Sequence, residues 1–281
     1  MRETIDLRIS EERAALVLGP EVGERLGDSV RRVVLPTTDE RLRLIGELER
    51  EFNRRGRAFF TGWDISRRYT EKELQSAEVL QLVPRAFFEP VGEMCGTEYD
   101  ESGACPHCGV GFIQKTDLFL DARRIPKKKD LVISIASEIL VSSRLVEAFQ
   151  ARGITGASFQ PVRHKTGRLL EEWRQLVITS PPVDIVPPTL IGSSPFDLDE
   201  RGRFRCPLGH VLGLHRLSEL WLSPAGNPGT DWMRTRQHLG WHQGVLRPHP
   251  ELLISPRLYR LLRELKATRF DVEVAHWNPT G

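Results

Sequence analysis

Residues 138–145 read EILVSSRL, and residues 251–258 read ELLISPRL. In each stretch a short apolar run leads directly into a serine, and Arg-Leu follows two residues later. Serine is favoured immediately before a helix, because its side-chain oxygen accepts a hydrogen bond from a free helix amide. The two stretches therefore predict two strands that each run into a helix, with Ser142 and Ser255 as the helix N-caps.

The likeness continues beyond the helices. Each predicted helix is followed by a stretch with alternating apolar residues, around Ala157 in one case and around Val272 in the other. A strand–helix–strand unit that occurs twice, around 131–162 and 246–276, is the economical interpretation. Two copies are too few for a solenoid, so we expect them to pack around one core.

The rest of the chain also mixes helix and strand signals. Apolar residues recur at helical spacing over 38–55, and Thr70 and Glu73 stand at capping-box spacing before a helix expected to end near Leu80. The stretch 82–91 is interrupted by two prolines and predicts an edge strand. We therefore predict an α+β fold, with mixed or antiparallel sheets and packed helices.

Length and charge set limits on function. The chain has 281 residues, of which 40% are hydrophobic, and 40 Lys and Arg against 38 Asp and Glu give a formal charge of +2. That balance excludes a strongly basic protein built chiefly to grip phosphate backbones. The chain has no apolar run long enough for a membrane helix and no secretory leader pattern, so we expect a cytoplasmic protein without a membrane partner.

The cysteines are the most informative residues. Cys105-Pro-His-Cys108-Gly is a zinc knuckle pattern, because two cysteines separated by two residues and followed by glycine place both sulfurs on one tetrahedral ion. Cys95-Gly96 has the same ending, but Gly92 stands where its partner cysteine would be. The surrounding stretch is rich in glycine and poor in apolar residues, so a metal is expected to hold it together.

The fourth ligand is left open by spacing alone. We predict Cys206, in the later sequence Arg-Cys-Pro-Leu-Gly-His, as the fourth ligand. His107 or His210 could take this place instead, and a third alternative is that the site has lost its metal. The predicted metal site is thus Cys95, Cys105, Cys108 and Cys206 with structural zinc. The predicted organisation is an N-terminal α+β region (1–88), a zinc-ribbon-like insert (89–116) and a C-terminal α+β domain with the duplication (117–281).

The sequence resembles a known bacterial family. The runs CGTEYDESGACPHCG, ILVSSRLVEAFQARGITGASFQPV and LLISPRLYRLLRELKATRFDVEVAH are similar to those of the double-CxxCG motif proteins, which form paralogous sets in myxobacteria and include toxin-immunity proteins. The resemblance covers Gly92 to about Val162 and Cys206 to His276. It implies a protein that neutralises a cognate toxin by binding it, although only one of the two expected CxxCG knuckles is complete.

Three functions from different classes follow. The first is an immunity-like protein that binds a toxin or another protein, which suits the balanced charge and the tryptophans of the C-terminal half. The second is a zinc-ribbon protein that binds nucleic acid through the basic stretch 123–129, a partner we favour less. The third is an enzyme without a recognisable motif, whose site would assemble around His238, His242 and Asp231. We predict the first, and no enzyme activity.

Overall fold

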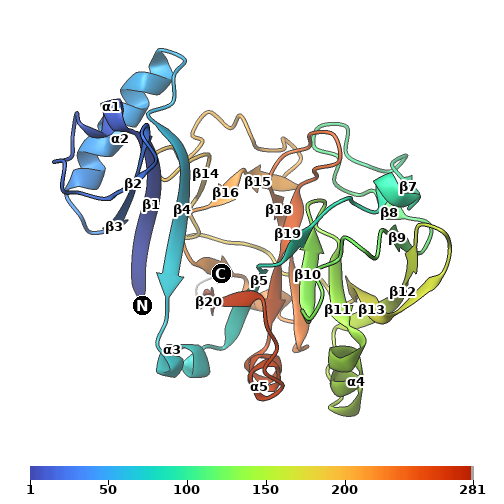
Figure 1. The fold of residues 1–281 in the computed structure, drawn as a ribbon. Helices are drawn as coiled ribbons and strands as arrows, with labels where there is room; N and C mark the ends of the chain where they lie inside the picture. The colour runs from blue at the N-terminus through green and yellow to red at the C-terminus, as the bar shows by residue number, and fades with distance from the viewer. Residues whose placement is uncertain (280–281) are drawn as a thin grey trace.

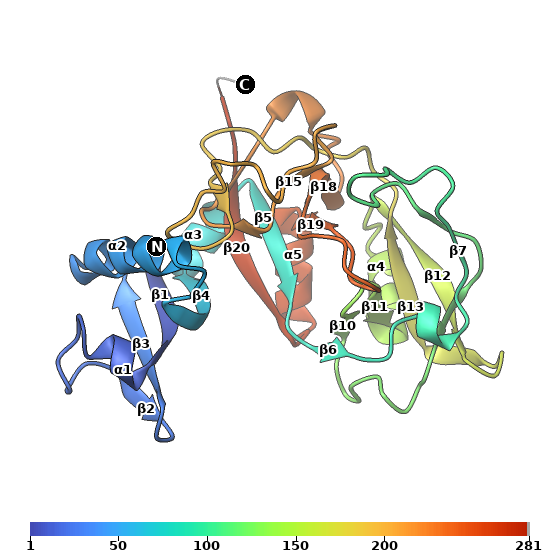
Figure 2. The same ribbon diagram turned by 90° about the horizontal axis from the view of Figure 1, so that it is seen from above.

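The computed structural model describes residues 1–279 and is built mainly of β-sheet with few helices. The described residues form one four-stranded sheet, two six-stranded sheets and two two-stranded ribbons (Figure 1). The predicted α+β class is confirmed at this level. Figure 2 shows the three larger sheets in a row, with the N-terminal sheet at one end.

The N-terminal module has its own core. Its sheet has the order β2-β3-β1-β4 with antiparallel pairing throughout. Helix α2 carries Leu42 and Ile45 into a cluster with Leu7 and Ile9 of the sheet, which confirms the helix predicted over 38–55. The elements are β1 (Arg2–Ser10), α1 (Glu11–Ala14), β2 (Glu24–Leu26), β3 (Val30–Pro36), α2 (Arg41–Arg54) and β4 (Phe60–Arg68).

The first six-stranded sheet has the order β6-β10-β11-β13-β12-β9. The pairs at its two ends, β6 with β10 and β12 with β9, are parallel, and the three pairs between them are antiparallel. Its elements are β6 (Phe87–Phe88), β9 (Leu118–Leu120), β10 (Leu131–Ser134), β11 (Ile139–Ser142), α4 (Ser143–Ala151), β12 (Ala157–His164) and β13 (Leu169–Ile178).

The second six-stranded sheet has the order β15-β18-β19-β5-β20-β17. The pairs at its ends are again parallel and the three inner pairs antiparallel, so both sheets have the same series of strand directions. Its elements are β5 (Val79–Pro84), β15 (Val211–Gly213), β17 (Leu220–Leu222), β18 (Trp232–Leu239), β19 (His249–Ile254), α5 (Pro256–Glu264) and β20 (Phe270–Trp277).

Both predicted helix starts are confirmed. The Ser142 hydroxyl accepts a hydrogen bond from the Leu145 N–H, and the Ser255 hydroxyl accepts one from the Leu258 N–H. Helices α4 and α5 lie at the lower side of the molecule in Figure 1. Their apolar faces join one cluster around the fully buried Trp232, which takes residues from both six-stranded sheets.

Strand β5 differs from the prediction. It lies between β19 and β20, so the predicted edge strand over 82–91 begins inside a sheet. Strands β5 and β6 belong to the two six-stranded sheets, so the predicted N-terminal region does not extend to residue 88. Pro84 is tolerated because it is the last residue of β5, where a ladder hydrogen bond is no longer needed. The two-residue β6 is the true edge strand.

Helix α3 (Glu71–Ser76) begins as predicted and ends early. Thr70 and Glu73 form the expected capping box. The helix stops at Ser76 rather than near Leu80, because Leu80 is drawn into β5, where its side chain is fully buried. Burial in the sheet thus outweighs local helix preference at this point.

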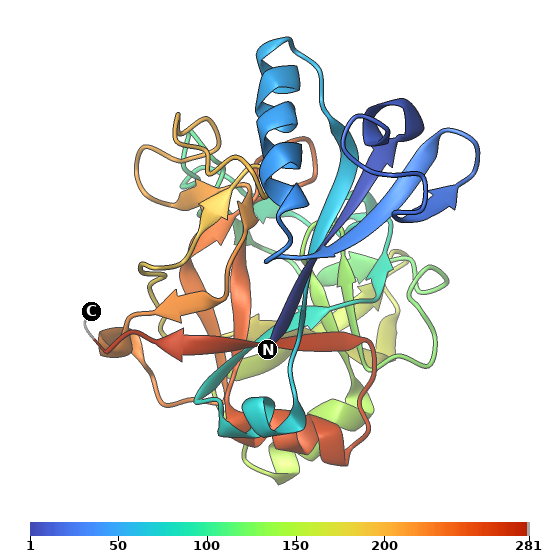
Figure 3. The ribbon, with the colours of Figure 1, turned by 90° about the vertical axis from the view of Figure 1, so that its left-hand side faces the viewer.

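A buried ion pair joins the N-terminal module to the second six-stranded sheet. Arg67 of β4 lies 2.9 Å from Glu273 of β20, also pairs with Glu3, and donates a hydrogen bond to the Leu217 carbonyl at 2.6 Å. The Arg67 side chain is only 1% exposed. Figure 3 shows the N-terminal sheet above this junction.

The remaining elements are short. Two two-stranded ribbons, β7–β8 and β14–β16, each enclose a loop that contains cysteine. Within residues 1–279 no helix has the length and apolar character needed to cross a membrane, since the longest, α2, has 14 residues. The short elements are η1 (Glu93–Cys95), β7 (Tyr99–Asp100), β8 (Ile113–Gln114), β14 (Ile191–Gly192), β16 (His215–Arg216) and η2 (Pro224–Gly226).

Candidate metal centre

Two similar turns build the site. In the loop between β7 and β8, the Cys105 N–H donates to the Val110 carbonyl at 2.8 Å. In the loop between β14 and β16, the Cys206 N–H donates to the Val211 carbonyl at 2.9 Å. Each turn also contains one glycine in the left-handed region, with φ of 71° in the first and 78° in the second. Glycine adopts this conformation without steric cost, so the backbone of each loop can turn back tightly beneath its cysteine.

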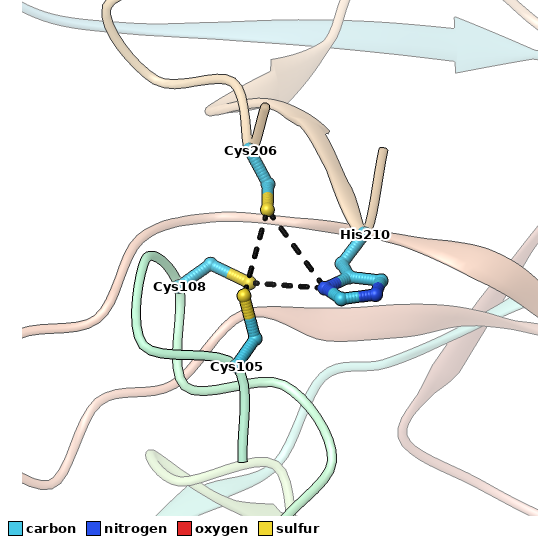
Figure 4. Close-up of side chains that lie close together, drawn as sticks. All are labelled: Cys105, Cys108, Cys206 and His210. Carbon is cyan, nitrogen blue, oxygen red and sulfur yellow. Dashed lines mark hydrogen bonds between the residues drawn. The ribbon is translucent and has the colours of Figure 1, made fainter. Parts of the chain in front are cut away.

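The two turns bring four metal-binding side chains together (Figure 4). The Sγ atoms of Cys105 and Cys206 are 3.7 Å apart, and Nδ1 of His210 lies 3.8 Å from the Sγ atoms of both Cys108 and Cys206. A tetrahedral ion with bonds of about 2.0–2.3 Å needs separations of about 3.6–3.8 Å between its ligand atoms. These three separations fit such an ion, and all four ligand atoms lie within 4.8 Å of one another.

Burial and charge also favour a cation here. The three thiols are buried, and Val110 and Val211 pack beside them. Burial opposes ionisation of Cys105, but the backbone N–H groups of His107 and Cys108, together with the side chains of His210 and Cys108, outweigh it and lower the pKa of Cys105. Burial and the neighbouring thiols raise the pKa of Cys108. A metal ion would remove this conflict, because it stabilises all the thiolates at once.

The predicted metal site needs one correction. Cys105, Cys108 and Cys206 lie in the cluster, but Cys95 does not, and His210 takes the fourth place. Cys95 belongs to η1, and burial raises the pKa of its thiol. Its expected partner position also has no room for a side chain, because a Cβ at Gly92 would lie 2.5 Å from both Glu138 and Leu118.

His210 was one of the alternatives, and the sequence held a signal for it. Cys206-Pro-Leu-Gly-His begins with Cys-Pro, as the first knuckle does, and it contains the glycine that the turn requires. The ligand simply stands after this glycine, whereas Cys108 stands before Gly109.

An arginine holds the first ribbon beside the cluster. Arg247, in the loop between β18 and β19, lies 4.4 Å from the ring centre of Phe112 and 5.3 Å from that of Tyr99. Its guanidinium group pairs with Glu93 at 3.4 Å and with Glu101. The Arg247 side chain is only 8% exposed and packs on the two aromatic rings, whereas its carboxylate partners Glu93 and Glu101 are about half exposed at the surface.

The residues considered for an enzyme site do not come together. His238 lies near the end of β18 and His242 in the loop that follows, so they do not share a helix face. Asp231 precedes the other end of β18, where it accepts hydrogen bonds from Ser255 and Arg257. Its carboxylate therefore fixes the start of helix α5.

No protein-family model matches this sequence, and a search of curated proteins finds no match. The similarity to the double-CxxCG proteins therefore stays a prediction. Fold and site define an α+β protein with three buried cysteines and one half-buried histidine that together could hold a metal ion.

Proposed function

We propose that Cys105, Cys108, Cys206 and His210 hold one structural zinc ion. The donor set supports this, because three thiolates and one imidazole in tetrahedral spacing are the ligands that zinc favours in structural sites. Four protein donors leave no open position for water or substrate, which is the mark of a structural rather than a catalytic site. Zinc with free cysteines also suits a reducing compartment, and we propose a cytoplasmic location.

The zinc would hold the ribbon-like insert against the C-terminal half of the chain. Two of its ligand sulfurs, on Cys105 and Cys206, lie 3.7 Å apart although they are 101 residues apart in the sequence. The β7–β8 ribbon contributes few apolar residues to the large cores, so a metal is the natural means of fixing its position.

We propose further that the two strand–helix–strand segments are copies of one unit. In both, an aspartate that directly precedes the strand next to an edge strand accepts a hydrogen bond from the N-cap serine and forms an ion pair with the arginine two residues later. The matched contacts are Asp130 with Ser142 (2.8 Å) and Arg144 (2.8 Å), and Asp231 with Ser255 (2.7 Å) and Arg257 (3.0 Å). Such a specific arrangement, found twice, is the support for duplication.

As the protein's activity we propose neutralisation of a cognate toxin by direct binding. The observation that carries this proposal is a set of large apolar side chains that stay exposed on the two cysteine-containing loops or on segments that flank or contact them: Met94 (68% exposed), Ile113 (65%), Leu208 (61%) and Trp241 (46%). We call this set the apolar rim. Exposed apolar groups of this kind, with a tryptophan among them, favour a protein partner. The likeness to immunity proteins supports a toxin as that partner.

Co-expression tests the activity. The protein is produced with the product of the adjacent gene, and growth and co-purification are measured. We expect relief of toxicity, and we expect Trp241→Ser to weaken it. Leu16→Ser is the matched control, since Leu16 is also exposed (60%) but lies in the N-terminal module. Equal rescue by both variants would contradict a role for the apolar rim, and no rescue by the wild type would contradict the activity.

Nucleic-acid binding is the second candidate. Lys127, Lys128 and Lys129 lie in the turn between β9 and β10, and within residues 1–279 none of them has an ion-pair partner. Titration of mixed DNA and RNA at low and moderate salt separates the candidates. A phosphate binder loses affinity steeply as salt rises, whereas binding through the apolar rim should change little.

A further inference from the structure

Three residues in each half of the C-terminal region correspond at a spacing of 101 positions. Cys105 corresponds to Cys206, Val110 to Val211 and Asp130 to Asp231, each pair being 101 residues apart. The first two pairs share the same backbone hydrogen bond, and the third pair shares the same serine and arginine partners. The correspondence thus begins at the knuckles and is not restricted to the strand–helix–strand segments.

After β10 and β18 the spacing becomes 113, as for Ser142 and Ser255. The second half therefore has twelve additional residues in the hairpin that β18 and β19 form. They lengthen the two strands and enlarge the loop that carries Trp241 and Arg247, and Arg247 contacts the ribbon of the first half. This insertion in the second half thus contacts the first half of the C-terminal region.

Strand β5 takes the place in the second sheet that β13 takes in the first. Gln175 of β13 lies opposite Leu140 and Gln160, and Gln81 of β5 lies opposite Leu253 and Glu273. Leu253 and Glu273 are the residues 113 positions after Leu140 and Gln160, so the two registers are identical. The sequences agree as well, with QLVI at 175–178 and QLVP at 81–84.

We infer that residues 79–279 contain two copies of one unit, and that each copy supplies one knuckle with two ligands to a single shared metal site. Strand β5 precedes the first copy in the chain but completes the sheet of the second copy. The first copy gives Cys105 and Cys108, and the second gives Cys206 and His210. Neither copy has a complete site alone. The inference rests on the proposed structural zinc and extends it, because the ion becomes the clasp between the two copies.

Exchange of the knuckles tests the shared site in the full-length chain. In one variant the triple change Leu208→His, Gly209→Cys and His210→Gly gives the second knuckle the sequence of the first. In the reciprocal variant His107→Leu, Cys108→Gly and Gly109→His give the first knuckle the sequence of the second. His210→Gly alone is the control that only removes a ligand. Cobalt(II) is titrated into each metal-free protein, and the thiolate-to-cobalt absorption is recorded.

If the knuckles are equivalent, both exchange variants bind one cobalt. Relative to wild type, the absorption then rises by about a third with four thiolates and falls by about a third with two. Exchange variants that bind cobalt no better than His210→Gly overturn the shared site. A wild-type chain that binds no metal overturns the zinc proposal as well, so the two failures are distinguishable.

A second exchange tests the role of β5. Pro84→Ile gives β5 the sequence of β13 at this position, and Ile178→Pro does the reverse. Both residues end their strands, opposite Phe270 and Ala157, which are themselves 113 residues apart. Equivalent strands should tolerate both changes with melting temperatures within about 3 °C of wild type. A loss of more than about 8 °C in either variant counts against the equivalence.

Discussion

Removal of the metal should lower the stability of the whole chain by a calculable amount. An ion held by the four-residue cluster would close a loop of 101 residues between Cys105 and Cys206. A cross-link that closes a loop of this length stabilises the folded state by about 4–5 kcal/mol, because it restricts the unfolded chain. With an unfolding entropy of about 2.1 cal/mol/K per residue, the 281 residues convert this into a loss of about 8 °C in melting temperature.

The assay is thermal unfolding of the full-length protein, followed by circular dichroism, with one equivalent of zinc and after treatment with a strong chelator. Cys108→Ala should bind well under half an equivalent of zinc and melt like the chelated protein. Cys95→Ala is the matched control, since it removes a buried thiol outside the cluster and should keep its zinc.

Two results would refute this reasoning. A chelated protein that melts within about 2 °C of the zinc-loaded one would show that the ion does not act as a cross-link. A Cys95→Ala protein that loses zinc as Cys108→Ala does would return Cys95 to the ligand set.

Three other predictions concern charged side chains. Arg247→Ala should lower the free energy of unfolding by about 1–2 kcal/mol through loss of its aromatic and carboxylate contacts, whereas the exposed Arg236→Ala should change it by less than about 0.5 kcal/mol in the same urea titration. Glu273→Ala should cost about 3–5 kcal/mol, because it leaves the buried Arg67 without its closest carboxylate on the second sheet, and a loss below about 1 kcal/mol would contradict the buried pair. The Arg41 side chain lowers the pKa of Asp39 to about 2, so this carboxylate stabilises the folded state above its ordinary pKa of 3.8 and loses the effect as the pH falls toward 2. The destabilisation caused by Asp39→Asn, about 1 kcal/mol at pH 7, should therefore shrink at pH 3, and a constant difference would contradict the shifted pKa.

Local signals were sufficient for some parts of the fold. The N-caps Ser142 and Ser255 and the capping box at Thr70 depend on residues within three or four positions, so the sequence alone predicts them correctly. The same holds for the turn at Cys105 and Cys108, whose geometry follows from spacing and one glycine.

These local signals did not predict which strands pair when the partners lie far apart in the sequence. Pro84, which is visible in the sequence, favours an edge strand, whereas the partners of β5 lie about 170 residues later in β19 and about 190 residues later in β20. Cys95 was taken as a ligand because Cys-Gly repeats locally, and only the crowding at Gly92 shows that no second knuckle fits there. His210 required the comparison of two turns 101 residues apart.

The place of β5 has a consequence for synthesis on the ribosome. Strand β5 is synthesised early, but its two neighbours are synthesised much later, since β19 ends at Ile254 and β20 ends at Trp277. At about 5–20 residues per second, the 193 residues between Pro84 and Trp277 take about 10–40 s to appear. During this time Leu80 and Leu82, which are buried in the finished protein, remain open to chaperones and to other nascent chains. A ribosome that stops before β20 therefore leaves a chain whose N-terminal module can fold but whose second sheet cannot close.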